Sequence, residues 1–442
     1  MKKILTARYV LPVTAPPIER GAILVEDGKI LSVGTLDEVR GVFKEAEVDD
    51  LGDAALMPGL VNCHSHLELT VMRGLLDRHD DDFGTWLTTL AQARAERFSE
   101  TDISNAALAG AIEGARAGVT CFGDIGRIGS HGHSSLRRVG LRGIVYQETE
   151  FAPDDRQAME AFQKLTASFE VLRKSDTALV RSGLSPHSPY TVSEPLCRQI
   201  AEFSAADGIP VTIHLSESNH EEELLLTGRG FFSNVFSKHG VEWTHKGRSA
   251  THFLNDTGLL RTRTLLAHCV KVSDADLKII SDSGASIAHC PKSNAKFGHG
   301  VAPLAKFTSR LIKTGVGSDS VASNNTVDLF EEVRFALLFA RTGDVPLFID
   351  AAGAIRLMTL GGAEALGLES EIGSLEPGKR ADIIAVSLSA VSQRPINDVE
   401  SSIVFSSGAR DVILTMVDGE EIYRDGRILT VDESEILKSI DR

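Results

Sequence analysis

The sequence is short of cysteine, of positive charge and of long apolar runs, and each shortage excludes a class of protein. Its five cysteines are dispersed and contain no CxxC pair, which argues against a disulfide framework and a thiolate zinc site. Its 61 acidic residues outnumber the 46 basic ones, for a net charge of −15. Since no basic stripe is present either, we expect no nucleic-acid partner. Because no apolar run reaches about 18 residues, we also expect no membrane span.

The first residues lack the organisation of a secretory signal. Two lysines precede a few apolar residues, but Arg8 and Pro12 interrupt the run, and no small-residue cleavage site follows. A cytoplasmic enzyme is the simplest interpretation. We expect the five cysteines to be small buried side chains.

The two ends of the chain share a pattern of short strands. Residues 1–57 contain alternating apolar segments separated by Gly and Asp-Gly turns, and the same pattern returns in 371–442. We therefore predict one small β-sandwich domain built from both ends, with residues 58–370 as a separate catalytic domain between them.

In the long middle part, apolar strands alternate with helical stretches. Helices are predicted over 100–118 and 193–208, the second with Ser193 as its N-cap and Gly208 just past its end. The predicted strands cover residues 61–66, 118–124, 141–148, 178–187, 209–217, 264–270, 284–291 and 314–320. This alternation is typical of the α/β class, and eight strands are the number that closes a (β/α)8 TIM barrel. Residues 228–246 are predicted to be an insertion or a lid after the fifth strand.

Histidines and an aspartate end five of these strands. They are His64 and His66 on the first strand, His214 on the fifth, His268 on the sixth, His289 on the seventh and Asp319 on the eighth. Active residues of a barrel lie at the C-terminal ends of its strands. Residues i and i+2 of a strand share a face, so His64 and His66 can face one ion. With further imidazole and carboxylate ligands they would form an open site for zinc, iron or manganese.

Each of these residues alone has an ordinary structural explanation. A lone HxH pattern means little, a single buried histidine is more often part of the core, and Asp319 can order a turn. Their joint occurrence at strand ends favours a metal site, because buried histidine and aspartate need partners. Glu217 follows His214 by three residues and can move protons between an activated water and a substrate nitrogen. The alternative for Glu217 is a solvent-facing loop acid.

Motifs along nearly the whole chain resemble one protein family. They are MPGLVNCHSHLELTVMRGLLD, SPHSPYTVS, VTIHLSES, TLLAHCV, HCPKSNAKFGHGVAPL, GSDSVASNN and GSLEPGKRADIIAV. Together they resemble the amidohydrolase superfamily, and within it the deaminase and chlorohydrolase branch. That branch includes methylthioadenosine/S-adenosylhomocysteine deaminases, aminodeoxyfutalosine deaminases, guanine and cytosine deaminases, and triazine hydrolases.

The resemblance implies a role for each matching residue. The implied metal ligands are His64, His66, His214 and Asp319. Glu217 would move protons to the substrate ring, His268 would hydrogen-bond the attacking water, and Asp319 would share in catalysis. His187 would contact the substrate. One ion is implied, since the fourth strand ends without a lysine for a second; Zn²⁺ is favoured, and Fe²⁺ or Mn²⁺ also suit the ligands. A homodimer is consistent with the family likeness.

The substrate depends on residues at the barrel mouth. The resemblance favours a small-molecule substrate, namely an adenine-bearing nucleoside such as aminodeoxyfutalosine, methylthioadenosine, S-adenosylhomocysteine or adenosine, which would lose its 6-amino group as ammonia. The alternative is a guanine or cytosine deaminase or an s-triazine (chloro)hydrolase. Gln147 stands where methylthioadenosine/S-adenosylhomocysteine deaminases usually carry arginine. Trp86, Arg94 and Gln147 are predicted substrate contacts, with packing or surface roles as their alternatives.

Overall fold

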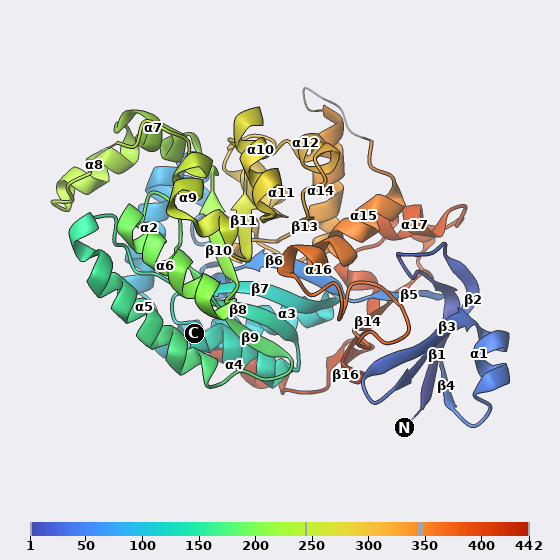
Figure 1. Ribbon diagram of the computed structural model, residues 1–442. Coiled ribbons are helices and arrows are strands. Elements are labelled where there is room, and N and C mark those ends of the chain that lie inside the picture. Colours follow the sequence, from blue (N-terminus) through green and yellow to red (C-terminus); the bar gives the residue numbers. More distant parts are fainter. Residues whose placement is uncertain (1, 244, 343–347, 441–442) are drawn as a thin grey trace.

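The computed structural model describes residues 2–243, 245–342 and 348–440 (Figure 1). Within these residues the strands form two sheets. One is a parallel eight-stranded sheet from the middle of the chain, and the other is a mixed nine-stranded sheet from both ends. The predicted α/β architecture is confirmed.

The parallel sheet curls into a barrel. Its strands are β6 (Leu60–Ser65), β7 (Val119–Gly126), β8 (Arg142–Glu148), β9 (Val180–Ser185), β10 (Val211–Leu215), β11 (Thr264–His268), β12 (Ser286–His289) and β13 (Thr314–Val316). Each pairs with its neighbour in chain order. Ser65 and Asp319 form a parallel bridge between the first strand and the segment after the last one, and the Asp319 N–H donates to the His64 carbonyl at 2.9 Å. This bridge makes the two ends of the sheet neighbours.

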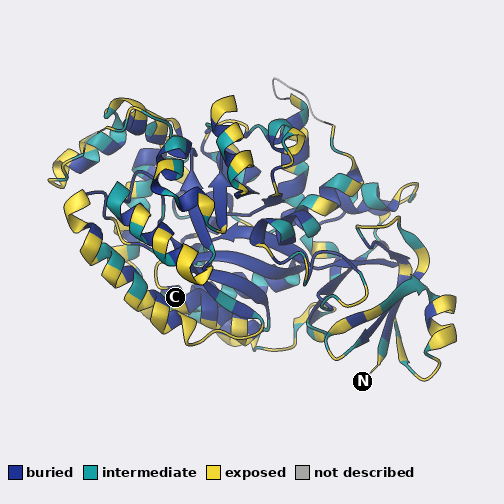
Figure 2. Cartoon of the chain, viewed as in Figure 1, coloured by how far each residue is buried: buried dark blue, intermediate teal, exposed yellow. Residues whose placement is uncertain are grey.

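Helices surround the barrel, and their outward faces are the exposed parts of the molecule in Figure 2. They are α2 (Phe83–Glu96), α3 (Glu100–Arg116), α4 (Ser130–Val139), α5 (Ala158–Arg173), α6 (Glu194–Asp207), α7 (Asn219–Thr227), α8 (Phe231–Lys238), α9 (Ala250–Thr257), α10 (Asp274–Ser283), α11 (Pro291–Lys296), α12 (Leu304–Ser309), α13 (Val321–Asn324), α14 (Leu329–Thr342), α15 (Ala351–Met358) and α16 (Leu360–Leu366).

The two helices predicted by range from the sequence are α3 and α6. Ser99 and Asp102 form a capping box at the start of α3. Ser193 occupies the N-cap position of α6, but its hydroxyl makes no capping hydrogen bond. Gly208 ends α6 with a φ of 65°, a left-handed conformation that glycine adopts without a steric penalty.

Both chain ends contribute strands to the mixed sheet. They are β1 (Lys3–Val10), β2 (Ile18–Glu26), β3 (Lys29–Thr35), β4 (Glu47–Asp50), β5 (Ala54–Pro58), β14 (Ile383–Ser387), β15 (Val412–Val417), β16 (Glu420–Arg424) and β17 (Arg427–Ile428). The antiparallel pair β5 and β14 joins the two ends. Leu5 and Ile23 from one end pack in the same buried cluster as Ile383 and Met416 from the other.

Asp-Gly pairs turn three of the hairpins in this sheet. They are Asp27-Gly28, Asp418-Gly419 and Asp425-Gly426, and in each pair both residues have positive φ. Two-residue turns of this backbone shape match the twist of antiparallel strands. The Asp-Gly turns recognised in the sequence therefore determine where these hairpins reverse.

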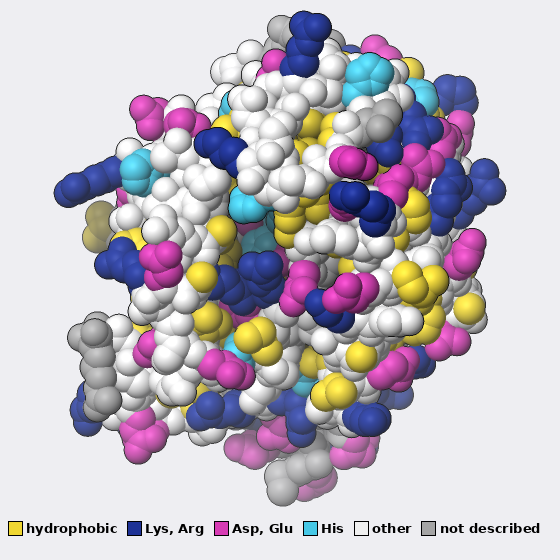
Figure 3. Space-filling view, turned by 90° about the vertical axis from the view of Figure 1, so that its left-hand side faces the viewer, with side chains coloured by type: hydrophobic (Ala, Val, Ile, Leu, Met, Phe, Trp, Pro, Cys, Tyr) yellow, Lys and Arg dark blue, Asp and Glu magenta, His cyan; other side chains and the backbone are white. Residues whose placement is uncertain are grey.

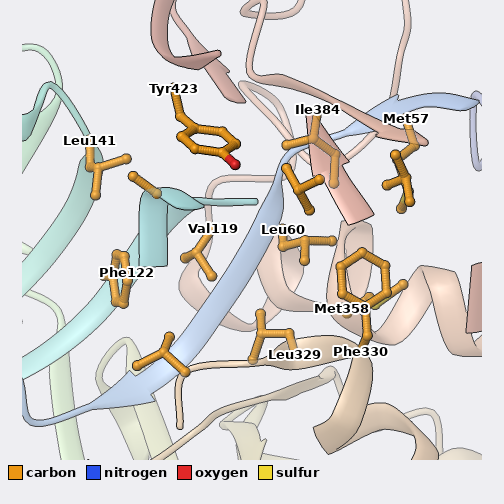
Figure 4. Packing of buried hydrophobic residues seen from close by; sticks show 14 of the residues in the cluster. Met57, Leu60, Val119, Phe122, Leu141, Leu329, Phe330, Met358, Ile384 and Tyr423 are labelled. Atoms are coloured by element: carbon orange, nitrogen blue, oxygen red, sulfur yellow. The ribbon is translucent and has the colours of Figure 1, made fainter. Parts of the chain in front are cut away.

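A buried apolar cluster joins the mixed sheet to the barrel (Figure 4). Met57 and Ile384 from the mixed sheet pack with Leu60 and Val119, the first residues of β6 and β7. The mixed sheet therefore covers the N-terminal ends of these barrel strands and leaves their C-terminal ends for a site. All five cysteines are buried, as predicted. No helix in the described part of the chain is long and apolar enough to cross a membrane.

Candidate metal centre and active site

The four predicted metal ligands meet at the C-terminal ends of the barrel strands. His66 Nε2 lies 3.2 Å from His214 Nε2, and Asp319 Oδ1 lies 3.5 Å from His64 Nε2 and 3.6 Å from His66 Nε2. In a tetrahedral zinc site with bonds of about 2.0–2.1 Å, ligand atoms stand roughly 3.3–3.5 Å apart. The spacing of these donor atoms therefore fits a single ion.

The protonation and bonding of the histidines also fit an ion. His64 is fully buried, and neither of its ring nitrogens has a hydrogen-bond partner among the described residues. Such a buried unpaired polar group costs free energy unless something binds it. His214 Nδ1 lies 2.8 Å from the His187 carbonyl, to which it donates, so its Nε2 keeps a free lone pair. Burial and the neighbouring imidazoles lower the pKa of His66 to about 3, which keeps it in the neutral form that binds metals.

Three serines orient Asp319. Ser293 Oγ and Ser323 Oγ donate to Oδ2 at 2.6 and 3.0 Å, and the Ser320 N–H donates to Oδ1 at 2.7 Å. Burial alone would raise the pKa of Asp319, but the His64 imidazole holds it well below its usual value. The φ of Asp319 is 56° and that of His268 is 72°, conformations that non-glycine residues adopt mainly where the surrounding structure enforces them.

Glu217 lies beside this cluster and faces two histidines. Its Oε1 is 3.9 Å from His268 Nε2 and 3.5 Å from His299 Nε2. Burial raises the pKa of Glu217, but the two imidazoles more than offset this and hold it below its ordinary value. His268 Nδ1 donates to Asn294 Oδ1 at 2.9 Å, which directs Nε2 toward the cluster. Glu217 is therefore buried, so the alternative of a solvent-facing acid is wrong.

His299 and Asn294 are site residues that the sequence interpretation missed. Both belong to the HCPKSNAKFGHG motif, and their spacing on α11 and the loop after it gave no periodic signal. His289 ends β12 as expected, but it is buried and lies outside the candidate ligand groups and the cavity.

A cavity of about 500 Å³ leads to the ligand cluster. Figure 3 shows the face of the molecule on which α2 and α8 lie, with histidine side chains in a hollow. Aromatic side chains form much of the cavity wall. They are Phe83 and Trp86 from α2, Phe231 and Phe232 from α8, and Phe297 after α11. Trp86 also packs edge-on against Phe297, with ring centroids 4.8 Å apart, so its packing role and its cavity position coexist.

Two of the other three predicted substrate contacts line the cavity, and the third does not. His187 and Arg94 line the cavity, and Arg94 forms an ion pair with the buried carboxylate of Glu68. The predicted contact of Gln147 is corrected, because its amide donates to the Arg127 carbonyl at 2.8 Å and accepts from the Gly129 N–H at 3.2 Å. Gln147 therefore stabilises the turn at 127–129 and is not among the residues that line the cavity.

The segment 228–246 supplies part of the cavity wall through α8. Phe231, Phe232, Val235 and His239 line the cavity from this segment. Residue 244 of the predicted insertion lies outside the described residues.

A closed barrel whose strand ends bring together three imidazoles, a carboxylate and a second, ionised acid defines a metal-dependent hydrolase. The chain belongs to the amidohydrolase family, whose model matches residues 55–422.

Individual relatives are similar over the full chain. It is 31% identical over 447 residues to a 5-methylthioadenosine/S-adenosylhomocysteine deaminase of Desulforudis audaxviator, covering 100% of this chain and 98% of the relative. The chain is also 29% identical over 442 residues to a 5'-deoxyadenosine deaminase of Methanosarcina mazei, and the match covers 99% of this chain and 96% of the relative. Among solved structures, an adenosine deaminase from Xanthomonas campestris with bound zinc has a TM-score of 0.85 and 26% identity, with 99% and 97% of the chains covered.

Proposed function

We propose that this amidohydrolase removes the 6-amino group of an adenine-bearing nucleoside and releases ammonia. The observation that carries the proposal is the position of Glu217, an ionised buried acid between two imidazoles at the inner end of the cavity. Hydrolytic deamination of a ring needs a proton carrier next to the activated water, and Glu217 has that position. The names of the relatives support a nucleoside in the class of methylthioadenosine, S-adenosylhomocysteine, 5'-deoxyadenosine or adenosine. Aminodeoxyfutalosine, which also carries adenine, remains in this class.

His64, His66, His214 and Asp319 would hold the metal ion. When bound, a divalent transition-metal ion acts as a Lewis acid and lowers the pKa of a water molecule, so that a nucleophile is available near neutral pH. We propose Zn²⁺, since these nitrogen and oxygen donors suit it and the Xanthomonas campestris relative carries it. Fe²⁺ and Mn²⁺ suit the same donors, and metal analysis of the purified protein distinguishes the three.

Two carboxylates of the site, Glu217 and Asp319, transfer the protons in the proposed reaction. Because the pKa of Glu217 lies below its usual value, Glu217 begins ionised, takes one proton from the attacking water and passes it to the ring nitrogen beside the reacting carbon. His268 Nε2 positions that water. A C–O bond forms at the reacting carbon. Asp319 then transfers the remaining hydroxyl proton to the amino group, the C–N bond breaks, and ammonia leaves.

Ammonia release from a substrate panel tests the proposal. The panel contains adenosine, 5'-deoxyadenosine, methylthioadenosine and S-adenosylhomocysteine, with guanine, cytosine and an amino-s-triazine as competitors. We expect the highest kcat/KM on one of the nucleosides. Turnover of the free bases or the triazine alone would replace the proposal with the other activities of the branch.

We further propose a division of labour along the chain. Residues 58–370 form the catalytic domain, while 1–57 and 371–442 form the β domain that supports it. We place the enzyme in the cytoplasm, since its five cysteines are buried thiols, the form that a reducing compartment maintains. A homodimer is tested by light scattering of the purified protein.

A further inference from the structure

Glu148 is a carboxylate at the end of β8 that the proposed deamination steps do not use. It lines the cavity, and its Oε1 is buried without a hydrogen-bond partner among the described residues. An acceptor in that state costs free energy when nothing binds it. Such a residue is a candidate for contact with a ligand that the cavity receives.

Glu148 lies next to His187 and His214. Ligand atoms of the three residues lie within 4.8 Å of one another, a grouping that by itself could suggest a second metal ion. The hydrogen bonds argue against that, because His214 Nδ1 donates to the His187 carbonyl and its Nε2 faces His66. His187 Nδ1 is 2.8 Å from Thr191 Oγ1. The Glu148 carboxylate and His187 Nε2 therefore remain without such a partner in the described part of the chain, and both residues line the cavity.

The cationic side chains near Glu148 form no ion pair with it. Arg94 is paired with Glu68, which also accepts the backbone N–H groups of Arg127 and Ile128 at 3.2 and 2.9 Å. No lysine or arginine among the described residues forms an ion pair with Glu148. Burial raises the pKa of Glu148 to about 7, and the nearby charges of Arg127 and Arg94 oppose that rise. The carboxylate is therefore available to a neutral hydrogen-bond donor.

Glu217 and Glu148, two of the acidic residues that line the cavity, have different neighbours around the ligand cluster. Glu217 contacts His268 and His299, whereas Glu148 groups with His187 and His214. A purine that offers its reacting carbon to the cluster and the adjacent ring nitrogen to Glu217 directs its sugar away from Glu217. Two oxygens of a carboxylate match two neighbouring hydroxyl donors.

We propose that Glu148 binds the ribose hydroxyls of the substrate and so selects ribonucleosides over deoxyribonucleosides and free bases. This inference rests on the proposed nucleoside deaminase function. Glu148 thereby determines specificity, while Glu217 carries the reaction.

Paired substrates test this role. The wild type, Glu148→Ala and Glu148→Gln are assayed on the best ribonucleoside of the panel and on its 2'-deoxy and 3'-deoxy analogues. A hydrogen bond to a charged group corresponds to roughly a 10–100-fold change in kcat/KM. We expect the kcat/KM of the wild type to fall by about 10–100-fold when the substrate lacks the bound hydroxyl. The kcat/KM of Glu148→Ala on the ribonucleoside should be lower than that of the wild type by the same factor, and this variant should act on the ribonucleoside and the deoxy analogue equally well within about 3-fold. Glu160→Gln, which removes an exposed carboxylate on α5, is the matched control.

The possible failures are distinguishable. Equal loss by Glu148→Ala on both substrates would overturn the sugar contact, as would loss of bound metal from that variant. If the wild type deaminates no adenine nucleoside, the proposed function fails instead. Calorimetric binding of inosine and hypoxanthine then tests the sugar contact without turnover, and equal affinity of wild type and Glu148→Ala for inosine would overturn it.

Discussion

At the scale of single residues, the neighbours of Glu217 determine what it can do. Two imidazoles within 4 Å of its Oε1 favour the ionised form, although burial opposes it. A carboxylate that remains ionised in a closed site can accept a proton from water at neutral pH. Its position after β10 brings that capacity to the ligand cluster.

Substituting an isosteric amide for this carboxylate tests its role in the reaction. Glu217→Gln is expected to keep the bound metal, because Glu217 is not among the candidate ligand groups, and to lose activity by about 10²–10⁴-fold, the usual contribution of a general acid–base. Steady-state kcat and metal content by mass spectrometry measure the two effects. Glu222→Gln, an exposed acid on α7, serves as control. Unchanged kcat in Glu217→Gln would remove this residue from the reaction.

The sequence predicted that residues would lie together where strand geometry alone determines their position. His64, His66, His214 and Asp319 lie at or just after the C-terminal ends of barrel strands, and strand ends of a closed barrel meet. The partners His299 and Asn294 lie on α11 and its following loop, whose path depends on packing against other helices. No spacing rule relates such loop residues to the strand ends.

At the scale of elements, α2 and α8 turn one side of the cavity into an aromatic wall. Phe231 and Phe232 of α8 are in ring contact, and Phe232 stacks on Tyr190 with centroids 4.1 Å apart. The wall is apolar, so it can bury the uncharged parts of a substrate.

The second prediction removes one ring from this wall. Phe231→Ala is expected to raise KM by about 5–30-fold with kcat within 2-fold, since an aromatic contact contributes roughly 1–2 kcal/mol to uniform binding. Michaelis–Menten analysis on the best substrate measures both constants. Phe335→Ala on α14, away from the cavity, is the control. A fall in kcat with constant KM would assign Phe231 to the reaction step instead.

The third prediction concerns the ion pair that joins β4 to β16. Arg424 donates two hydrogen bonds to Asp49, at 2.8 and 2.9 Å, and these lower the pKa of Asp49 from 3.8 to about 2. Because the folded pKa is the lower one, the pair stabilises the fold above pH 3.8, and this contribution is lost as the pH falls toward 2. Asp49→Asn should cost up to about 1 kcal/mol near pH 7, a value typical of partly exposed pairs.

Urea unfolding of wild type and Asp49→Asn across this pH range measures the difference. The two unfolding free energies should converge at the acid end. Glu47→Gln on the same strand is the control. A difference that is constant with pH would show that the carboxylate charge is irrelevant to the stability of the sheet.

β8 shows where element-scale prediction failed. Its range was predicted well, yet Gln147 turns to the 127–129 turn while Glu148 lines the cavity. Side chains of a strand alternate between faces, so an error of one residue moves a predicted contact to the wrong side. A single sequence contains no signal that determines which of two adjacent polar residues faces the lumen.

At the scale of the molecule, the β domain and the barrel are one continuous body. The recurring Asp-Gly turns predicted that both chain ends share a domain, and the β5–β14 pairing confirms it. The ion pair between Arg142 and Asp382 was not predictable, because the two residues are 240 positions apart and their approach depends on the register of both sheets. Arg142 begins β8 and Asp382 precedes β14, so the pair crosses the boundary between the two units.

The last prediction tests how strongly this pair ties the units together. Arg142 Nε donates to Asp382 Oδ2 at 2.7 Å and Arg142 Nη2 to Oδ1 at 3.0 Å, and both side chains are almost fully buried, 3% and 2% exposed. Asp382 also accepts the Asp418 N–H at 2.9 Å. Asp382→Ala leaves a buried guanidinium without its main partner, which should cost about 3–5 kcal/mol of unfolding free energy. Guanidinium chloride unfolding measures this cost.

The double variant Asp382→Ala/Arg142→Met separates the charge from the packing. Removing both charges should recover most of the loss, because the penalty arises from the unpaired cation rather than from the missing contact. Asp53→Ala, which breaks the partly exposed contacts with Arg8 and Arg394, should cost below about 1 kcal/mol. A single Asp382→Ala variant as stable as wild type would mean that water or backbone carbonyls satisfy Arg142, and that apolar packing around Leu60 and Ile384 alone holds the β domain on the barrel.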